Sequence, residues 1–168
     1  MKKINLLFVP LLLLVTACGS AFRVYHDLDP SANFDQYKTY SFLDFTEGNK
    51  KTITGIELER IRTSFARALE AKGLEYQEDA SDIKVQITVY FREASDLSYG
   101  WHYPSSYNYI ERALAIDIFE GSTKKHIWHG AAVGQVGRTS EERTEELPLQ
   151  VEKILASYPV ATALKEDI

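Results

Sequence analysis

Cysteine is nearly absent from the 168-residue chain: Cys18 is the only one, so no disulfide can form within it. The chain also lacks a basic surplus, since 24 acidic residues outnumber 19 lysines and arginines and give a formal net charge of −5. An acidic domain is poorly suited to binding nucleic acid or anionic lipid headgroups. No glycine-rich phosphate-binding motif is present, and no apolar run approaches the roughly 20 residues of a membrane-spanning helix. These absences argue against nucleic-acid binding, phosphate-loop chemistry and a membrane span.

The N-terminal segment carries the strongest positive signal. Lys2 and Lys3 precede an apolar run, 6–15, whose length of about ten residues is typical of a secretory signal peptide. Ala17 then stands directly before Cys18. A small residue before a lone cysteine resembles the cleavage box of bacterial lipoproteins, and this resemblance implies that Cys18 is lipidated and becomes the new N-terminus. An ordinary signal peptide with an unrelated cysteine, or an uncleaved membrane anchor, is the alternative.

Three segments are therefore expected: a removed signal peptide over 1–17, a lipidated tether over 18–21 and a single domain over 22–168. Cleavage leaves 168 − 17 = 151 residues, enough for one domain with an ordinary core and no disulfide. It also removes two lysines, which leaves 17 basic against 24 acidic residues. Attachment to the membrane is therefore expected to come from lipid on Cys18 rather than from basic patches.

Hydrophobic periodicity predicts five strands and two helices. The strands are expected over 22–28, 37–43, 82–92, 112–120 and 126–136. The first helix is expected from Thr54 to Lys72, with a capping box between Thr54 and Glu57, and the second over 147–157 with Pro148 in its first turn. Residues 44–53 and 138–146 are expected to be irregular. This order predicts an α+β domain, a mainly antiparallel sheet with two helices packed on one face.

Several short segments, taken in order, carry a resemblance to a known family. They are Asn33–Tyr40, Ala68–Gly73, Ser81–Val85, Ala115–Phe119, Ile127–Gly130 and Ile154–Pro159. Their order and spacing resemble the bacterial envelope lipoproteins that share domain of unknown function 4136, although the usual Trp-Arg-Gly-like element reads Trp128-His129-Gly130 here. The resemblance implies a small α+β lipoprotein domain and supplies no activity and no catalytic residues.

Residues suited to catalysis or metal binding do not form a recognisable pattern. His126 and His129 are three apart on a predicted strand, where an odd separation places side chains on opposite faces. The serines lack a nucleophile-elbow context, and the glutamates of 141–146 fit a solvated charge run. We therefore expect no catalytic residue, no metal and no cofactor, and a protein that is not an enzyme. The small residues of 130–134 indicate that another element packs closely over the last strand.

A tyrosine-rich segment, 99–109, is the least ordinary part of the chain, since five of its eleven residues are aromatic. The candidate contact residues are Tyr99, Trp101, Tyr103, Tyr107 and Tyr109. Such rings suit sugar faces and protein partners, or they seal a sheet. We expect Trp101 to seal the sheet and Tyr107 and Tyr109 to be exposed.

The sequence thus favours a non-catalytic envelope lipoprotein that acts by contact with another envelope component, a protein or a glycan. Gly19 after the cysteine resembles outer-membrane sorting, so we expect lipid anchoring in the outer membrane with the domain facing the periplasm. The alternative is a ligand-binding module that grips a glycan or a small molecule through residues 99–109.

Overall fold

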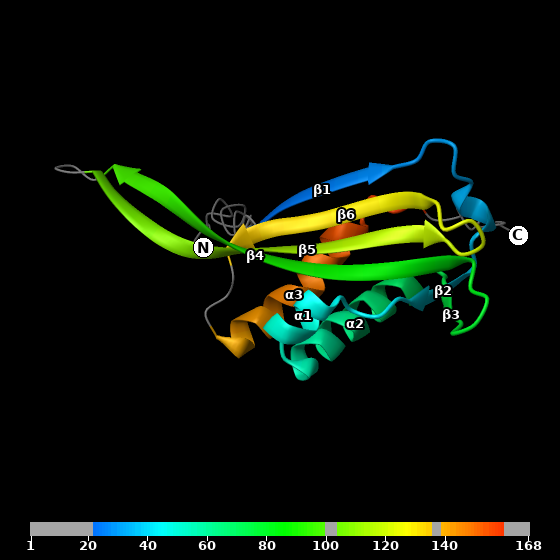
Figure 1. Cartoon of the computed structure of the whole chain (residues 1–168). Coiled ribbons are helices and arrows are strands. Elements are labelled where there is room, and N and C mark those ends of the chain that lie inside the picture. The colour runs from blue at the N-terminus through cyan, green and yellow to red at the C-terminus, as the bar shows by residue number, and fades with distance from the viewer. Residues whose placement is uncertain (1–21, 100–103, 136–138, 160–168) are drawn as a thin grey trace, which may run out of the picture.

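The computed structural model describes the backbone of residues 22–99, 104–135 and 139–159, and their side chains except those of 96–99 and 104–107. One mixed sheet carries helices on a single face (Figure 1). The strands are β1 (Phe22–Leu28), β2 (Thr39–Phe42), β3 (Glu75–Tyr76), β4 (Ile83–Tyr99), β5 (Pro104–Glu120) and β6 (His126–Gln135), in the order β1-β6-β5-β4-β2-β3. The helices are α1 (Glu47–Thr52), α2 (Gly55–Glu70) and α3 (Ser140–Leu155), with a 3₁₀ turn η2 at Phe34–Gln36.

Antiparallel pairing dominates the sheet, as expected. β1, β6, β5 and β4 pair antiparallel to one another in turn, whereas β2 pairs parallel to both β4 and β3. Parallel neighbours need a long crossover, and here α1 and α2 make up most of the connection that leaves β2 and returns to the sheet at β3. The α+β prediction with helices on one face is therefore confirmed, with the short helix α1 in addition to the two expected.

The core lies between the sheet and the helices. Alternation along β4 turns Ile87, together with Val85 and Val89 two positions away, toward the helical layer. Leu114 of β5 faces the same way. The exposed fractions of Ile87 and Leu114, 2% and 1%, confirm the predicted faces. The other buried contributors are Ile83, Ile116 and Ile118 from the sheet, Leu58, Ile61, Phe65 and Leu69 from α2, and Leu147, Val151, Ile154 and Leu155 from α3.

The start of α2 agrees with the prediction only in part. Thr54 Oγ1 accepts a hydrogen bond from the Glu57 backbone N–H at 3.2 Å, which satisfies one of the free donors of the first turn. The reciprocal half of the expected capping box is replaced, because the Glu57 carboxylate lies 3.4 Å from a guanidinium nitrogen of Arg112.

The last helix begins earlier than expected. α3 starts at Ser140 behind a complete capping box between Thr139 and Glu142, so the expectation of an irregular 138–146 segment and a helix from 147 is wrong. Pro148 consequently lies inside the helix rather than in its first turn. A proline there removes one backbone hydrogen bond; the buried residues on either side of it, Leu147 and Val151, anchor the helix against the sheet.

The connection 44–53 contains α1 rather than irregular chain, and this helix has a structural role. The Asn49 side chain donates from Nδ2 to the Val89 carbonyl at 2.6 Å and accepts from the Val89 N–H at 3.1 Å. β2 ends at Phe42 and pairs with β4 only as far as Val85. The Asn49 amide therefore replaces a neighbouring strand at Val89, which explains why this polar side chain is buried.

Close packing over β6 is confirmed at Gly130. A Cβ atom there would lie 2.2 Å from Trp128 Cη2 and 2.9 Å from Ile154 Cγ2. The indole ring of Trp128 and helix α3 therefore occupy the space that a side chain would need. None of the helices within the described ranges is long and apolar enough to cross a membrane.

Candidate functional site

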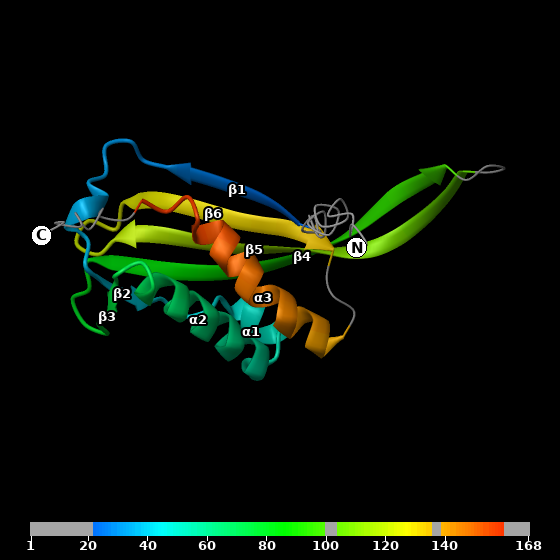
Figure 2. The same ribbon diagram turned by 180° about the vertical axis from the view of Figure 1, so that it is seen from behind.

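A two-stranded ribbon projects from one end of the domain. β4 and β5 remain paired up to Tyr99 and Pro104, but β6 reaches only as far as Glu111. Residues 93–99 and 104–110, named the arm here, therefore extend past the rest of the sheet and past the helices (Figures 1 and 2). The expected tyrosine-rich loop is wrong in extent, because both strands continue into it and leave only 100–103 between them.

Three of the five candidate aromatic residues lie on this arm. Tyr99 is in register with Pro104, Tyr107 with Asp96, and Tyr109 with Ala94. Tyr109 is half-buried rather than exposed as expected. Trp101 and Tyr103 lie outside the described residues, as do the side chains of Tyr99 and Tyr107, so the sealing and glycan-binding hypotheses for these rings stay predictions.

The base of the arm is fastened on its outer face by a buried carboxylate. Glu111 is 4% exposed, yet its side chain lies opposite Arg92 of β4, whose Nε donates to Oε2 at 2.5 Å. Arg23 of β1 approaches the other carboxylate oxygen at 3.7 Å. One buried charge thus links three strands at the point where the sheet narrows to two.

A second buried charge fastens the helical face at the same level. Arg112 is 5% exposed and donates to Gln150 Oε1 at 3.0 Å, and it pairs with Glu57 at 3.4 Å. Burial lowers the pKa of Arg112, while the charge of Glu57 acts in the opposite direction. Removing a partner of a buried ion would leave the charge uncompensated. β5 is therefore tied to both α2 and α3 directly below the arm.

Large apolar side chains are exposed beside these charges. Phe91 and Ile110 are on neighbouring strands at the helical side, 41% and 47% exposed, and Tyr90 on the outer face is 61% exposed. Exposed apolar groups gathered in one place mark contact surfaces more often than scattered ones do. The arm and this apolar base form the candidate functional site.

The N-terminal end of the described chain lies at the same end of the sheet. Phe22, the first residue of β1, pairs with Gly134 near the end of β6, next to the arm base. Cys18 lies outside the described residues, four positions earlier. Four residues reach at most about 14 Å, so a lipid on Cys18 would hold the arm end of the domain close to a bilayer.

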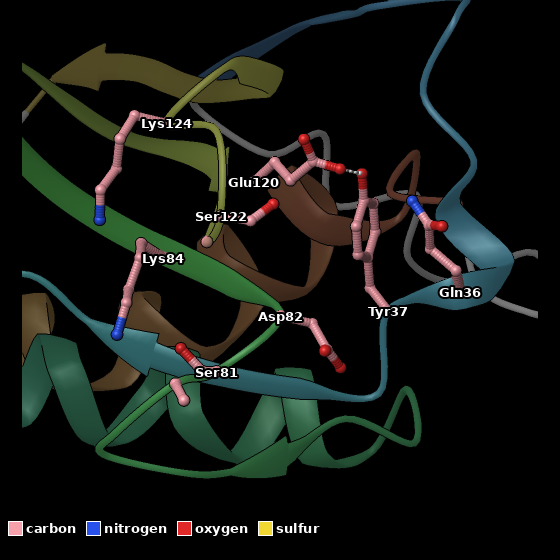
Figure 3. Close-up of a pocket in the computed structure, with 10 residues that line it drawn as sticks. Gln36, Tyr37, Ser81, Asp82, Lys84, Glu120, Ser122 and Lys124 are labelled. Atoms are coloured by element: carbon pink, nitrogen blue, oxygen red, sulfur yellow. Dashed lines mark hydrogen bonds between the residues drawn. The ribbon is translucent and has the colours of Figure 1, made fainter.

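A hollow of about 610 Å³ lies at the opposite end (Figure 3). Several of its polar side chains are bonded within the protein. The Tyr37 hydroxyl donates to Glu120 Oε1 at 3.1 Å, and Asp82 accepts from the backbone N–H groups of Lys38 and Thr39 at 2.8 and 2.9 Å. Partial burial acts to raise the pKa of Asp82, but these hydrogen bonds outweigh it and lower the pKa below its ordinary value.

A lysine and two serines beside this hollow form a directed chain of hydrogen bonds. Lys84 Nζ donates to Ser41 Oγ at 2.8 Å, and Ser81 Oγ donates to the Ile83 carbonyl at 2.9 Å. The two hydroxyls are 2.9 Å apart, so Ser41 is the donor between them. Activation of a serine would require the opposite direction, with the serine proton moving to a base. The arrangement satisfies the hydrogen bonds of two buried hydroxyls and does not activate either serine as a nucleophile.

The histidine prediction needs a correction. A β-bulge between Ile118 and Phe119 places His126 opposite Phe119, although His129 is opposite Asp117. His126 and His129 therefore lie on the same outer face, with ring centroids 6.4 Å apart, and the expectation of opposite faces is wrong. Ile127 and Trp128 between them are both 1% exposed, which is possible because the bulge interrupts the alternation.

With this geometry described, comparison with known proteins identifies the family. The model of a domain of unknown function, DUF4136, matches residues 24–160. The chain belongs to this family. No curated protein sequence matches the chain. The resemblance inferred from the short sequence segments is thereby confirmed.

Solved structures share the DUF4136 fold at low sequence identity. A PDZ domain protein from Parabacteroides distasonis matches with a TM-score of 0.56 at 16% identity, over 83% of this chain and only 35% of its own. A single-substitution variant of PelC from Paraburkholderia phytofirmans, a dodecamer, matches with a TM-score of 0.53 at 12% identity, over 80% of this chain and 95% of its own. Identities this low establish a common fold alone.

A minor lipoprotein from Acinetobacter baumannii also matches, at 13% identity over 71% of this chain and 87% of its own. Its TM-score of 0.38 is too low to establish a common fold. The general class of envelope lipoprotein, expected from the sequence, is compatible with the family.

Proposed function

We propose that this DUF4136 protein is a lipid-anchored envelope lipoprotein that acts by contact with other proteins through the arm, and not by catalysis. The observation that carries the proposal is the arm itself, with exposed Phe91 and Ile110 at its base. Anchoring through Cys18 in the outer membrane, with the domain in the periplasm, rests on the N-terminal sequence.

The energetics of the arm support a contact role. A two-stranded ribbon without a packed face is only marginally stable in water. Within the described residues, β6 ends at Gln135 and β2 ends at Phe42, so neither of these strands pairs with the edges of the ribbon. Such edges accept further strands from a partner. The hydrogen bonds of Glu111 and Arg112 fasten the base of the ribbon to the rest of the domain.

Further copies of the same chain are the partner that we propose. The structure of PelC, which has the same fold, is described as a dodecamer. A lipid on Cys18, four residues before Phe22, would confine every copy to one membrane surface, with every arm base at a similar distance from it. Confinement raises the effective concentration of the copies, so that a modest contact suffices for assembly.

A double substitution in the apolar base tests this proposal. Phe91→Thr with Ile110→Thr removes the exposed apolar surface and places threonine, a residue favoured in strands, at both positions. Ile56→Thr is the matched control, since Ile56 is 75% exposed and belongs to α2 rather than to a strand of the arm. Circular dichroism verifies that each variant remains folded.

Light scattering of detergent-extracted protein and crosslinking in cells provide the measurements. The wild type and the Ile56→Thr control should form species larger than one chain, and the double variant should run as a monomer. A wild-type protein that is monomeric and yields no crosslinked partner would contradict the contact function. Crosslinks to a different protein that disappear in the double variant would support the arm as the contact surface but would contradict self-assembly.

The anchor is tested separately. Cys18→Ser should abolish lipid labelling and either release the domain from membranes or leave the uncleaved precursor, because the acyl chains are the proposed attachment. Normal lipid labelling of the serine variant would refute the assignment of Cys18.

A further inference from the structure

We propose that Asp117, His126 and His129 form a binding site for a Zn²⁺ ion on the outer face of the sheet. One nitrogen or oxygen atom from each of the three side chains lies within 4.8 Å of the other two. His129 Nδ1 is 2.7 Å and His126 Nε2 is 3.1 Å from the same oxygen, Asp117 Oδ1. Three donors thus converge on one point from two strands.

The donor chemistry fits zinc. Imidazole nitrogen and carboxylate oxygen are ordinary zinc ligands with bonds of about 2.0–2.2 Å, which place neighbouring ligand atoms of a tetrahedral site roughly 3.3–3.5 Å apart. The observed separations from Asp117 Oδ1 fall short of this range by about 0.2–0.8 Å. Rotation of the side chains can supply the missing separation, because all three are partly exposed: His126 is 47% exposed, His129 36% and Asp117 24%.

The present hydrogen bonds mark the place that the ion would take. His126 Nε2 lies 3.1 Å from the Trp128 carbonyl as well as from Asp117 Oδ1, so it faces two acceptors. Without metal, a proton on this nitrogen mediates the contact. Zinc would displace that proton, as metals do when they bind imidazole. The ion would then lie between His126 Nε2 and the Asp117 carboxylate.

The strand register and one ring contact position the donor side chains. The bulge at Ile118/Phe119 turns both histidines to one face, and direct strand pairing sets Asp117 beside His129. Phe119 packs against the His126 ring at 4.9 Å between centroids, with the planes 31° apart. A hollow of about 200 Å³ beside the histidines is lined by Asp27, which pairs with His129 from β1.

Asp27 and water are the candidates for a fourth ligand. Three protein ligands leave one position of a tetrahedral zinc ion open. The site would therefore bind the ion at an exposed surface and crosslink β5 to β6 at the bulge, an activity separate from contact through the arm.

The test is titration of the full chain with Zn²⁺ alone, after chelator treatment, by calorimetry and by thermal unfolding. The sample should be prepared without a polyhistidine tag and with the thiol of Cys18, the only cysteine, blocked, so that neither contributes ligands. His126→Gln, His129→Gln and Asp117→Asn remove one donor each. His26→Gln is the matched control, because His26 is exposed on β1 and pairs with Gly130 outside the cluster.

We expect one Zn²⁺ per chain, a higher unfolding temperature with zinc, and at least a tenfold loss of affinity in each of the three cluster variants. His26→Gln should bind as the wild type does. Absorption spectra of the Co²⁺-loaded chain give a second measurement, since nitrogen and oxygen ligands in a tetrahedral field produce visible bands. The proposal is overturned if the folded wild type fails to bind zinc, or if the cluster variants bind as tightly as the control.

Discussion

Replacing Gly130 by alanine adds one methyl group where β6, the Trp128 ring and helix α3 meet. The new Cβ would lie 2.2 and 2.8 Å from the Trp128 ring atoms Cη2 and Cζ3, and 2.9 Å from Ile154 Cγ2. Ordinary contact begins at 3.4 Å, so the ring would have to move by more than about 1 Å. Trp128 and Ile154 are 1% and 0% exposed, so the movement would have to take place within the buried core.

Overpacking of this kind costs about 1–3 kcal/mol in the free energy of unfolding. The lower entropy of the unfolded alanine chain offsets about 0.4–1 kcal/mol of that cost. We therefore expect a net loss of about 1–2 kcal/mol, which lowers the unfolding temperature by roughly 2–8 °C in a domain of this size. Gly55→Ala is the control: apart from its chain neighbours and the backbone of its own helix, no atom lies within 4 Å of its Cβ position, so stability should be unchanged or slightly higher.

A double-mutant cycle with Trp128→Phe identifies the cause. Phenylalanine lacks the two ring atoms that meet the new methyl group, and it also lacks the indole nitrogen, which is buried without a hydrogen-bond partner among the described residues. Gly130→Ala should then cost less in the Trp128→Phe background than in the wild type, with a coupling of 0.5 kcal/mol or more by the usual scale for contacting residues, roughly 0.5–3 kcal/mol. Urea unfolding followed by circular dichroism measures all four proteins. Additive costs would refute the packing argument.

Two further predictions concern polar groups. Asn49→Ala should lower the free energy of unfolding by about 1–3 kcal/mol, because two backbone groups of β4 lose their partner; in denaturant titrations the exposed Asn33→Ala should change little. Hydrogen bonding to Lys125 is the main cause that lowers the pKa of Asp29 to about 2, from 3.8. Its stabilising effect is thus present above about pH 3.8 and lost as the pH falls toward 2. Asp29→Asn should flatten the dependence of stability on pH in this window, measured at low salt, whereas Asp35→Asn on an exposed turn should leave that dependence in place.

The elements that local chemistry determines could be predicted from the sequence. Error-free alternation in β4 identified the buried face, and Ile87 and Leu114 are indeed core residues. Thr54 marks the start of α2 because a side chain there can accept from the first turn whatever the rest of the chain does. The complete capping box at Thr139 was equally local, but the charged residues after it obscured the helix. A run of charge is compatible with a solvated helix face as well as with irregular chain.

Features that depend on a partner strand could not be predicted. The arm exists because each of its strands supplies the hydrogen bonds of the other. The loop-like composition of 99–109 therefore did not indicate that the strands continue into this segment. The bulge opposite Phe119 is a property of the β5–β6 register, and it reverses the face that alternation alone assigns to His126. The candidate metal site could therefore not be predicted from the sequence. α1 is fastened to the sheet at the backbone of Val89, to which the Asn49 side chain bonds, and this long-range contact leaves no local pattern in the sequence.

The two proposals use opposite ends of the same strand. His126 begins β6 beside the candidate zinc site, and Gln135 ends it beside the arm base. Nine steps of roughly 3.3 Å separate them by about 30 Å. If Cys18 carries lipid, the arm end faces the bilayer and the histidines face the aqueous compartment, from which a metal ion would arrive. Changes at sites so far apart should be additive, so the loss of zinc binding in His129→Gln would leave assembly intact, and the arm variant would still bind zinc.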